Sequence, residues 1–273
     1  MPDETIITSL QNPRVKALVK LRDHRGRRKA GLFIAEGVRA VQRAIEAGLR
    51  VESVWVCSEL LGAAGGLPLS TNAEVVAVSP AVFKKIAYVR EPEGILAVCE
   101  PPRWVLDDLP TADRSTLDLV VVGTEKPGNL GAMVRSADLA GCRSVLAAGT
   151  PVDAMNPNAI RASTGSVFTL PTISASEGDT IAHLKQHHTR VLAAVVEGEV
   201  EHTQADYTGP CAIVIGPEDR GLGDAWTQAA KETGGQTVRI ATAGRSADSL
   251  NASVAAGVLL FEALRQRKAH GLQ

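Results

Sequence analysis

The chain has 273 residues, a formal net charge of -1 and a composition that is 45% hydrophobic and 22% charged. These values are typical of a soluble globular protein with one large domain or two ordinary ones. No apolar run approaches the roughly 18 residues of a membrane span, and the amino terminus lacks the layout of a secretory signal. Aromatic residues make up only 3% of the chain, which argues against an open sheet that binds single-stranded bases by stacking.

A segment near the amino terminus is strongly basic, with eight basic residues against one acid, Asp23. The basic residues are Arg14, Lys16, Lys20, Arg22, Arg25, Arg27, Arg28 and Lys29. Asn12 and Pro13 predict the start of a helix, and residues 25–29 are expected to form the loop that follows it. A solvated helix surface is one interpretation, but so large a bias favours a surface that binds a polyanion.

Residues 30 to 99 alternate short apolar runs with helical patterns, which predicts a small α/β domain. Its expected strands cover residues 32–35, 51–56, 75–78 and 95–98, and its expected helices cover 37–47 and a short segment from Pro80. A segment rich in proline and acidic residues follows. The predicted division is a small α/β domain over 1–104, a linker over 105–116 and a second domain over 117–273.

In the second domain, strands and helices alternate more clearly, which predicts a mainly parallel sheet with helices on both faces. The expected strands cover 118–122, 144–148, 190–196, 211–215 and 236–241. The expected helices cover 129–140, 177–188, 224–232 and 249–267. The last helix is nearly apolar on all sides from Leu250 to Phe261, so we expect it to be buried in protein.

A glycine-rich loop, GTEKPGNLGAMVRSADLAG over residues 123–141, follows the first strand of this domain. Such loops often hold phosphate, but this one matches neither common nucleotide pattern. A dinucleotide site requires G-x-G-x-x-G and an acid about 20 residues later, and this chain lacks both. A P-loop requires Lys and then Ser or Thr, where this chain has Asn129 and Leu130.

Two further loops lie at a strand end and a helix start: GPEDRGL over residues 216–222 and SADSLNAS over residues 246–253. The carboxyl ends of parallel strands share one edge of a sheet, so we expect the first two loops to converge. The third loop joins them if its strand, which ends near Ala241, is adjacent.

Three sequences in these loops, PGNLGAMVRSAD, IGPEDRGL and SLNASVAAG, resemble the ordered motifs of the SpoU (TrmH-like) branch of the SPOUT RNA methyltransferases. NPRVKALVKLRD and FIAEGVRAV in the first domain resemble, more weakly, a ribosomal-protein-like RNA-binding domain. The family implies methyl transfer from S-adenosylmethionine to a ribose 2′-hydroxyl of RNA. It also implies a deep trefoil knot in the second domain and a homodimer with active sites at the subunit interface.

The resemblance also implies roles for individual residues. Arg135 is placed at the ribose and its 3′ phosphate, where a guanidinium stabilises a developing alkoxide better than it acts as a base. Asn129 and Glu218 are expected to tie the first two loops together and to orient Arg135, although Glu218 as a simple helix cap stays open. Ser249 and Asn251 open the last helix, where either residue caps it or hydrogen-bonds the substrate. Ser249 is the better placed as the N-cap, so Asn251 is expected to have the functional role. The expected catalytic residues are Arg135, Asn129, Glu218, Asn251 and Ser249.

The remaining site residues also come from the resemblance and from charge. The expected cofactor-binding residues are Gly216, Glu218, Gly221, Ile240, Leu250 and Asn251. The expected RNA-binding residues are Arg14, Lys16, Arg25, Arg27, Arg28, Lys29 and Arg161. Two positions depart from the family pattern: Lys126 stands where many members have an acid, and Ala252 where Val is common.

Metal and disulfide chemistry are not expected. His183 and His187 have the spacing of two zinc ligands, but no glutamate follows His183 and no third ligand is evident, so a solvated helix face is the better interpretation. The four cysteines are scattered without CxxC spacing, which favours reduced core thiols in a cytoplasmic protein. They are Cys57, Cys99, Cys142 and Cys211.

The RNA substrate and the biological role stay open on the sequence. The first domain favours large-subunit (23S) ribosomal RNA over tRNA, because compact tRNA enzymes of this branch often lack such a domain. Some family members protect the ribosome from antibiotics, so a resistance role stands beside a housekeeping one. A non-catalytic RNA-binding module and a dehydrogenase-like nucleotide enzyme are the alternatives, and the intact loop residues and the failed dinucleotide pattern argue against them.

Overall fold

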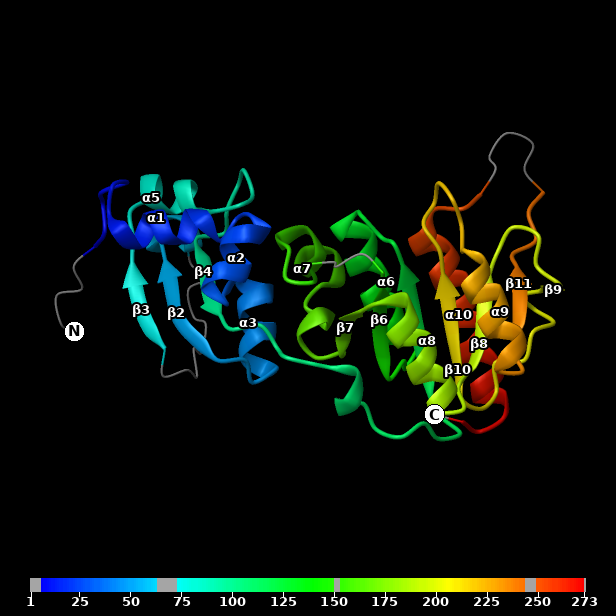
Figure 1. Cartoon of the computed structure of the whole chain (residues 1–273). Helices are drawn as coiled ribbons and strands as arrows, with labels where there is room; N and C mark the ends of the chain where they lie inside the picture. Colours follow the sequence, from blue (N-terminus) through cyan, green and yellow to red (C-terminus); the bar gives the residue numbers. More distant parts are fainter. Residues whose placement is uncertain (1–5, 63–72, 150–152, 244–248, 273) are drawn as a thin grey trace. The chain divides into compact units, whose positions relative to one another are not determined.

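The computed structural model describes residues 6–62, 73–149, 153–243 and 249–272 (Figure 1). The chain folds into two compact units. Unit 1 comprises Met1–Arg103 together with Met155–Thr169, and unit 2 comprises Trp104–Ala154 together with Leu170–Gln273. The chain therefore returns to the first unit in the middle of the segment that the sequence analysis assigns to the second domain.

Unit 1 is built on a four-stranded mixed sheet in the order β1-β4-β2-β3. The strands are β1 (Phe33–Glu36), β2 (Val51–Val56), β3 (Glu74–Ala77) and β4 (Ile95–Cys99). The central strand β4 runs antiparallel to both β1 and β2, and β2 runs parallel to β3. All four strands lie where the apolar runs predict them, and the buried core of Trp55, Phe83 and Leu96 lies against this sheet.

The basic segment forms two helices, α1 (Pro13–Lys20) and α2 (His24–Ala30), so the loop predicted over residues 25–29 is wrong. Asp23 caps α2 by accepting a hydrogen bond from the backbone N–H of Gly26 at 2.7 Å. Only glycine fits at position 26, because a Cβ there would lie 1.8 Å from the carbonyl oxygen of Lys20. Helix α2 therefore depends on the Asp23 cap and on the close contact at Gly26, and the basic composition of residues 25–29 predicts neither of them.

The other helical elements of unit 1 are α3 (Val38–Glu46), α4 (Ser58–Leu61), α5 (Pro80–Ile86), α7 (Pro157–Ser163) and the 3-10 turn η3 (Ser166–Phe168). The last two come from the returning segment. Contacts of α7 with β1 hold it in unit 1, and the rings of Phe33 and Phe168 lie 5.5 Å apart between centroids. This packing is apolar and close, which is typical of a permanent part of a core.

Unit 2 contains a seven-stranded sheet in the order β7-β6-β5-β10-β8-β11-β9, and every pair in it is parallel. The strands are β5 (Leu117–Val122), β6 (Ser144–Ala148), β7 (Thr172–Ala175), β8 (Arg190–Ala194), β9 (Val200–Glu201), β10 (Cys211–Ile215) and β11 (Gln236–Arg239). The predicted parallel α/β sheet is confirmed. The two edge strands, β7 and β9, are short and carry polar residues, so apolar runs do not reveal them.

The helices of unit 2 are α6 (Pro127–Leu139), α8 (Glu177–Gln186), α9 (Asp224–Glu232) and α10 (Ala252–Ala269), with a 3-10 turn η2 at Leu106–Asp108. Helices α8 and α9 cover one face of the sheet, and α6 and α10 pack together on the other (Figure 1). All four cysteines are buried and form no disulfide, as predicted.

The prediction that the last helix is buried on all sides is wrong for the single chain. Ala256, Leu259 and Leu260 of α10 are buried, but Val254 is 51% exposed and Phe261 is 47% exposed. The buried face packs on α6 and β10, while the opposite stripe lies at the surface of the part of unit 2 that the structure describes. No helix in the described ranges is long and apolar enough to cross a membrane.

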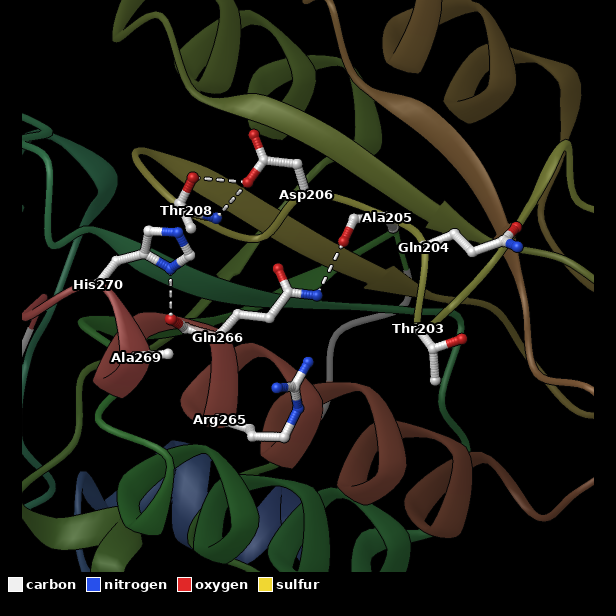
Figure 2. Close-up of a pocket in the computed structure, with 9 residues that line it drawn as sticks. All are labelled: Thr203, Gln204, Ala205, Asp206, Thr208, Arg265, Gln266, Ala269 and His270. Atoms are coloured by element: carbon white, nitrogen blue, oxygen red, sulfur yellow. Dashed lines mark hydrogen bonds between the residues drawn. The ribbon is translucent and has the colours of Figure 1, made fainter.

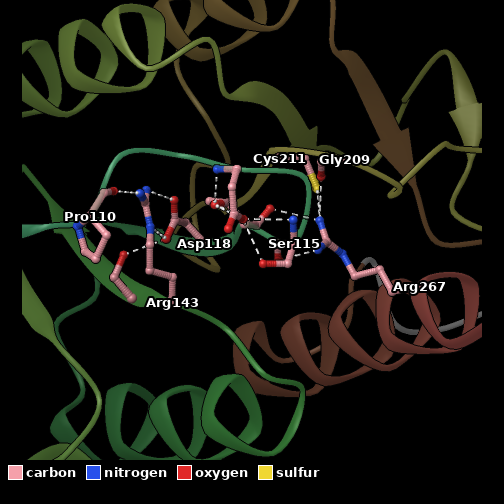
Figure 3. A network of polar contacts seen from close by, with 10 residues as sticks. Pro110, Ser115, Asp118, Arg143, Gly209, Cys211 and Arg267 are labelled. Carbon is pink, nitrogen blue, oxygen red and sulfur yellow. Dashed lines mark hydrogen bonds and ion pairs between the residues drawn. The ribbon is translucent and has the colours of Figure 1, made fainter. Parts of the chain in front are cut away.

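A buried polar network anchors the carboxyl end of α10 to the start of the sheet (Figure 3). Arg267 is 4% exposed, and its guanidinium donates to the carbonyl oxygens of Ser115 at 2.6 Å, Thr116 at 2.9 Å and Gly209 at 2.6 Å. Beside it, Arg143 binds the buried carboxylate of Asp118 through Nε at 3.1 Å and Nη2 at 2.5 Å. The network ties the last helix to the segments that precede β5 and β10.

Candidate cofactor and catalytic site

The carboxyl ends of β5, β10 and β8 form the floor of the candidate site. Ile215 at the end of β10 pairs with Val121 of β5 and with Ala194 of β8, so the three strands end at the same level. The loops at 123–131 and 216–222 leave from adjacent strands, as predicted. Gly216 has no room for a side chain, because a Cβ would lie 2.7 Å from the backbone of Gly221 and the second loop therefore folds tightly on itself.

The carboxylate of Glu218 joins all three loops. It accepts hydrogen bonds from Asn129 Nδ2 at 3.0 Å, from Lys126 Nζ at 3.2 Å and from the backbone N–H of Ala252 at 3.3 Å, and also from Asn251 Nδ2. These donors, the Ala252 N–H foremost, hold the pKa of Glu218 below its ordinary value of 4.5. The predicted tie between Asn129 and Glu218 is present, and Lys126, which departs from the family pattern, is part of it.

The third loop reaches this centre although its strand is not adjacent. β11 is separated from β10 by β8, and the contact is made by the start of α10. Asn251 is the N-cap of α10, accepting from the backbone N–H of Ser253 at 3.0 Å, so the prediction that Ser249 caps this helix is wrong. Ser249 lies two residues earlier and is exposed, and the first part of loop three, residues 246–248, lies outside the described residues.

A cavity of about 410 Å³ opens at these strand ends. Five of the predicted cofactor-binding residues line it, namely Gly216, Glu218, Gly221, Ile240 and Leu250, and so does Ser249. Asn251 does not line it and contacts Glu218 instead. A smaller hollow of about 270 Å³ adjoins the cavity between the first two loops, where Lys126, Asn129 and Arg220 lie.

The cavity fits S-adenosylmethionine better than it fits a phosphorylated nucleotide. Its walls are largely backbone and apolar side chains such as Val196, Ile240 and Leu250, which suit an adenine ring and a methionine chain. The acidic side chains of Glu218 and Asp219 suit a cationic sulfonium group and would repel a pyrophosphate, although Arg220 also lines the cavity.

Arg135 lies apart from both hollows in the single chain. It is exposed on α6, lines neither cavity, and has no hydrogen-bond or ion-pair partner among the described residues. Six residues of helix separate it from Asn129, a rise of about 9 Å along the axis. Among the described residues, Arg135 makes no direct contact with Asn129 or Glu218 that would support their predicted role in orienting it.

Several residues of the cavity were not expected from the sequence. Val195 and Val196 follow β8 and line it, and Arg220 borders both hollows. A Cβ on Gly123 would lie 3.2 Å from Nη2 of Arg220, so this guanidinium lies over the turn that follows β5. Val195 and Val196 line the cavity because β8 lies beside β10 in the sheet. The order of the strands cannot be read from the sequence pattern, so these two residues could not be predicted.

The predicted RNA-binding residues fall into three groups. Lys16, Arg25, Arg28, Lys29 and Arg161 are exposed. Arg14 is exposed but forms a two-bonded pair with Glu74 at 2.9 and 2.7 Å. Arg27 is 5% exposed and donates to the carbonyl of Leu21 at 2.7 Å, so its assignment to an RNA-binding surface is wrong: burial gives it a structural role in joining α1 to α2.

Two other features of unit 2 carry no site. A hollow of about 400 Å³ between residues 203–208 and the end of α10 is lined by exposed polar side chains such as Asp206, Arg265 and His270 (Figure 2). The rings of His183 and His187 lie 4.4 Å apart. His183 is buried, which lowers its pKa, so the prediction of a solvated helix face is wrong for this residue. Within the described ranges, no group of three or more side chains of the kinds that ligate metals is found.

Comparison with known proteins decides the family. Residues 116–261 match the model of the SpoU rRNA Methylase family, and residues 12–97 match the MRM3-like substrate binding domain. The chain belongs to the SpoU rRNA methylase family. The returning segment 155–169 lies within the residues that match the methylase family, although it packs in unit 1.

Individual SpoU relatives are similar over nearly the whole chain. The 23S rRNA (uridine(2479)-2′-O)-methyltransferase of Streptomyces viridochromogenes is 34% identical, over 96% of this chain and 92% of that protein. The crystal structure of an RNA 2′-O ribose methyltransferase is 40% identical, with a TM-score of 0.84 over 96% of this chain and 99% of the other. The SpoU methyltransferase AviRb of Streptomyces viridochromogenes, solved with AdoMet, is 29% identical, with a TM-score of 0.85 over 95% and 99%.

Proposed function

We propose that this SpoU protein transfers the methyl group of S-adenosylmethionine to a ribose 2′-hydroxyl of large-subunit ribosomal RNA. The observation that carries the proposal is the joining of all three loops by Glu218 beside an apolar cavity at the strand ends. Relatives named as 23S rRNA 2′-O-methyltransferases support the substrate. The matching substrate binding domain in unit 1 favours ribosomal RNA over tRNA.

The bound cofactor supplies an activated methyl group, so the protein has to align the hydroxyl and stabilise its developing negative charge. Glu218 fixes the first turn of α6 and the start of α10 through Asn129 and Asn251. Arg135 extends from the same helix as Asn129 with no partner among the described residues. We assign to Arg135 the binding of the 3′ phosphate and the stabilisation of the alkoxide, while the proton leaves to water or phosphate.

The proposal includes a homodimer whose active sites are completed at the subunit interface. A single chain leaves Val254 and Phe261 of α10 and Leu139 of α6 exposed, which is an uncommon position for large apolar side chains packed on neighbouring helices. We propose that a second copy covers these side chains and brings its Arg135 to the cavity, which the chain's own Arg135 does not line. The trefoil knot stays a prediction, supported by the packing of α10 against α6 and β10.

The proposal also includes a cytoplasmic location and a role in antibiotic resistance. The cytoplasmic location is supported by the four cysteines, which form no disulfide. A role in antibiotic resistance is tested by comparing the growth of cells with and without the gene on ribosome-targeting antibiotics, and unchanged sensitivity would leave a housekeeping role.

Methylation mapping tests the function directly. Purified chain is incubated with labelled S-adenosylmethionine and with transcripts of 23S rRNA, 16S rRNA or a tRNA pool, and 2′-O-methylated nucleotides are located in each. We expect one nucleotide of 23S rRNA to be labelled. We expect Arg135→Ala to lower the rate by about 100-fold or more, while its affinity for S-adenosylmethionine stays within about threefold, because the role proposed for Arg135 is at the RNA phosphate and the alkoxide and not at the cofactor. Labelling of tRNA alone, or of no RNA, would contradict the proposal.

A further inference from the structure

Unit 1 contains a further hollow, of about 300 Å³, that lies outside the methyl-transfer site. Three segments that are distant in sequence form it: the turn from β1 into α3, the loop after α5, and helix α7 of the returning segment. All of its lining residues belong to unit 1. Its volume is at the lower end of the roughly 300–1,000 Å³ of small-ligand sites.

Tyr88 is fixed at both ends in one wall of this pocket. Its backbone N–H donates to Glu36 Oε2 at 2.7 Å, and its hydroxyl accepts from Asn158 Nδ2 at 3.0 Å. Asn158 in turn accepts from Arg161 Nη2 at 2.7 Å. Arg161 and Arg22 each place a guanidinium 5.9 Å from the centre of the Tyr88 ring. A rigid aromatic ring beside guanidinium groups is the arrangement that holds an unstacked base.

The charges around the pocket suit a nucleotide. The exposed side chains of Arg22, Arg39 and Arg161 form no salt bridge within the described residues, so their charge is available to a phosphate. The acids of the pocket already bind backbone N–H groups: Glu36 binds those of Tyr88 and Val89, and Glu93 binds that of Val38 at 2.8 Å. Each carboxylate keeps free lone pairs that accept N–H donors from a base edge.

We propose that this pocket binds one unpaired nucleotide of the RNA substrate, with its base against Tyr88 and Arg161, its Watson–Crick edge toward Glu36, and its phosphates toward Arg22 and Arg39. Guanine fits best, because its edge presents two adjacent N–H donors to a carboxylate. The pocket thereby anchors the RNA at a point separate from the methylated ribose. This inference rests on the proposed RNA function, but it does not depend on which RNA is methylated.

Variants of the pocket test the inference in the full chain. Affinities for transcripts of 23S rRNA and 16S rRNA and for a tRNA pool are measured by filter binding at one salt concentration. On the RNA that the wild type binds tightest, we expect Tyr88→Leu to bind about 5- to 100-fold more weakly and Tyr88→Phe within about threefold, because only the former removes the stacking surface. Arg161→Gln should also weaken binding, whereas Arg50→Gln, which removes an exposed charge of unit 1 paired with Glu100, should not.

The outcomes separate this inference from the proposed function. The affinity for S-adenosylmethionine and the melting temperature of each variant show that the fold is intact, and Arg161→Gln decides the matter if Tyr88→Leu does not fold. Ultraviolet crosslinking to the bound RNA should join a guanosine to the peptide that contains Tyr88. If tRNA proves to be the substrate, the proposed function fails but a weaker Tyr88→Leu variant still supports the pocket. Wild-type affinity in Tyr88→Leu and Arg161→Gln would overturn it.

Discussion

At the scale of single residues, the site depends on the ionised carboxylate of Glu218. Glutamine at this position would keep the size but present an amide to the donors of Asn129 and Asn251, so we expect Glu218→Gln to lower the rate of methyl transfer by about 10- to 100-fold through misplaced loops. The cofactor affinity should fall with it, because Glu218 lines the cavity. Single-turnover kinetics and calorimetry measure the two effects, and an unchanged rate would show that the loops hold without this carboxylate.

The pH dependence of the same residue follows from its lowered pKa. A carboxyl group with a lowered folded-state pKa contributes its interactions above its ordinary value, 4.5, and loses them as the pH falls through the folded value. We therefore expect the affinity for S-adenosylmethionine to show no inflection due to Glu218 between about pH 5 and pH 8. An inflection in that range that disappears in Glu218→Gln would mean that the carboxyl pKa is raised instead.

The role of a residue could be predicted from the sequence where the residue belongs to a motif, and could not be predicted where burial determines the role. The loop residues Asn129 and Glu218 meet as the motifs imply. Arg27 has the same composition context as its neighbours Arg25 and Arg28, yet it is buried. The difference lies in the direction that each side chain takes from α2, and a run of basic residues contains no information about that direction.

At the scale of elements, Arg267 fixes helix α10 to the sheet. We expect Arg267→Met to lower the free energy of unfolding by about 2–4 kcal/mol, because each buried carbonyl left without a donor costs about 1–3 kcal/mol and such losses do not add in full. Urea denaturation measures the change. Arg265→Met is the matched control, since Arg265 is exposed and, among the described residues, forms its ion pair with Glu262 on the same helix; it should cost less than about 1 kcal/mol. Equal losses in the two variants would refute the anchoring role.

Elements with strong apolar periodicity could be predicted, and short or externally stabilised ones could not. The buried strands β5, β6 and β10 lie where their runs of Val, Leu, Ile and Ala place them. The edge strand β7 has four residues and a mixed pattern, so its hydrogen bonds to β6 define it rather than its composition. Helix α10 begins at Ala252, three residues after the predicted start at 249, because Asn251 caps it.

At the scale of the whole molecule, the exposed stripe on α10 predicts self-association. Replacing Phe261 by glutamate would place an unpaired charge in the proposed interface, and we expect the dimer dissociation constant to rise by about 100-fold or more. Val75→Glu is the control, because Val75 is similarly exposed at 42% but lies on β3 of unit 1. Sedimentation over a range of concentrations gives the mass, and a wild-type monomer, or a Phe261→Glu dimer as tight as the wild type, would contradict the prediction.

The return of residues 155–169 to unit 1 has a consequence for how this protein can be divided. A fragment cut after Arg103 would lack α7 and η3, and it would leave Phe33 without the ring of Phe168 that covers it. If two relatives exchanged their chains at the single boundary near residue 104, the product would contain β1 from one parent and α7 from the other. These two elements pack against each other, so their surfaces would no longer be matched. Only exchanges that carry both stretches together keep this surface matched, which couples the divergence of the amino-terminal domain to that of a short stretch inside the methylase sequence.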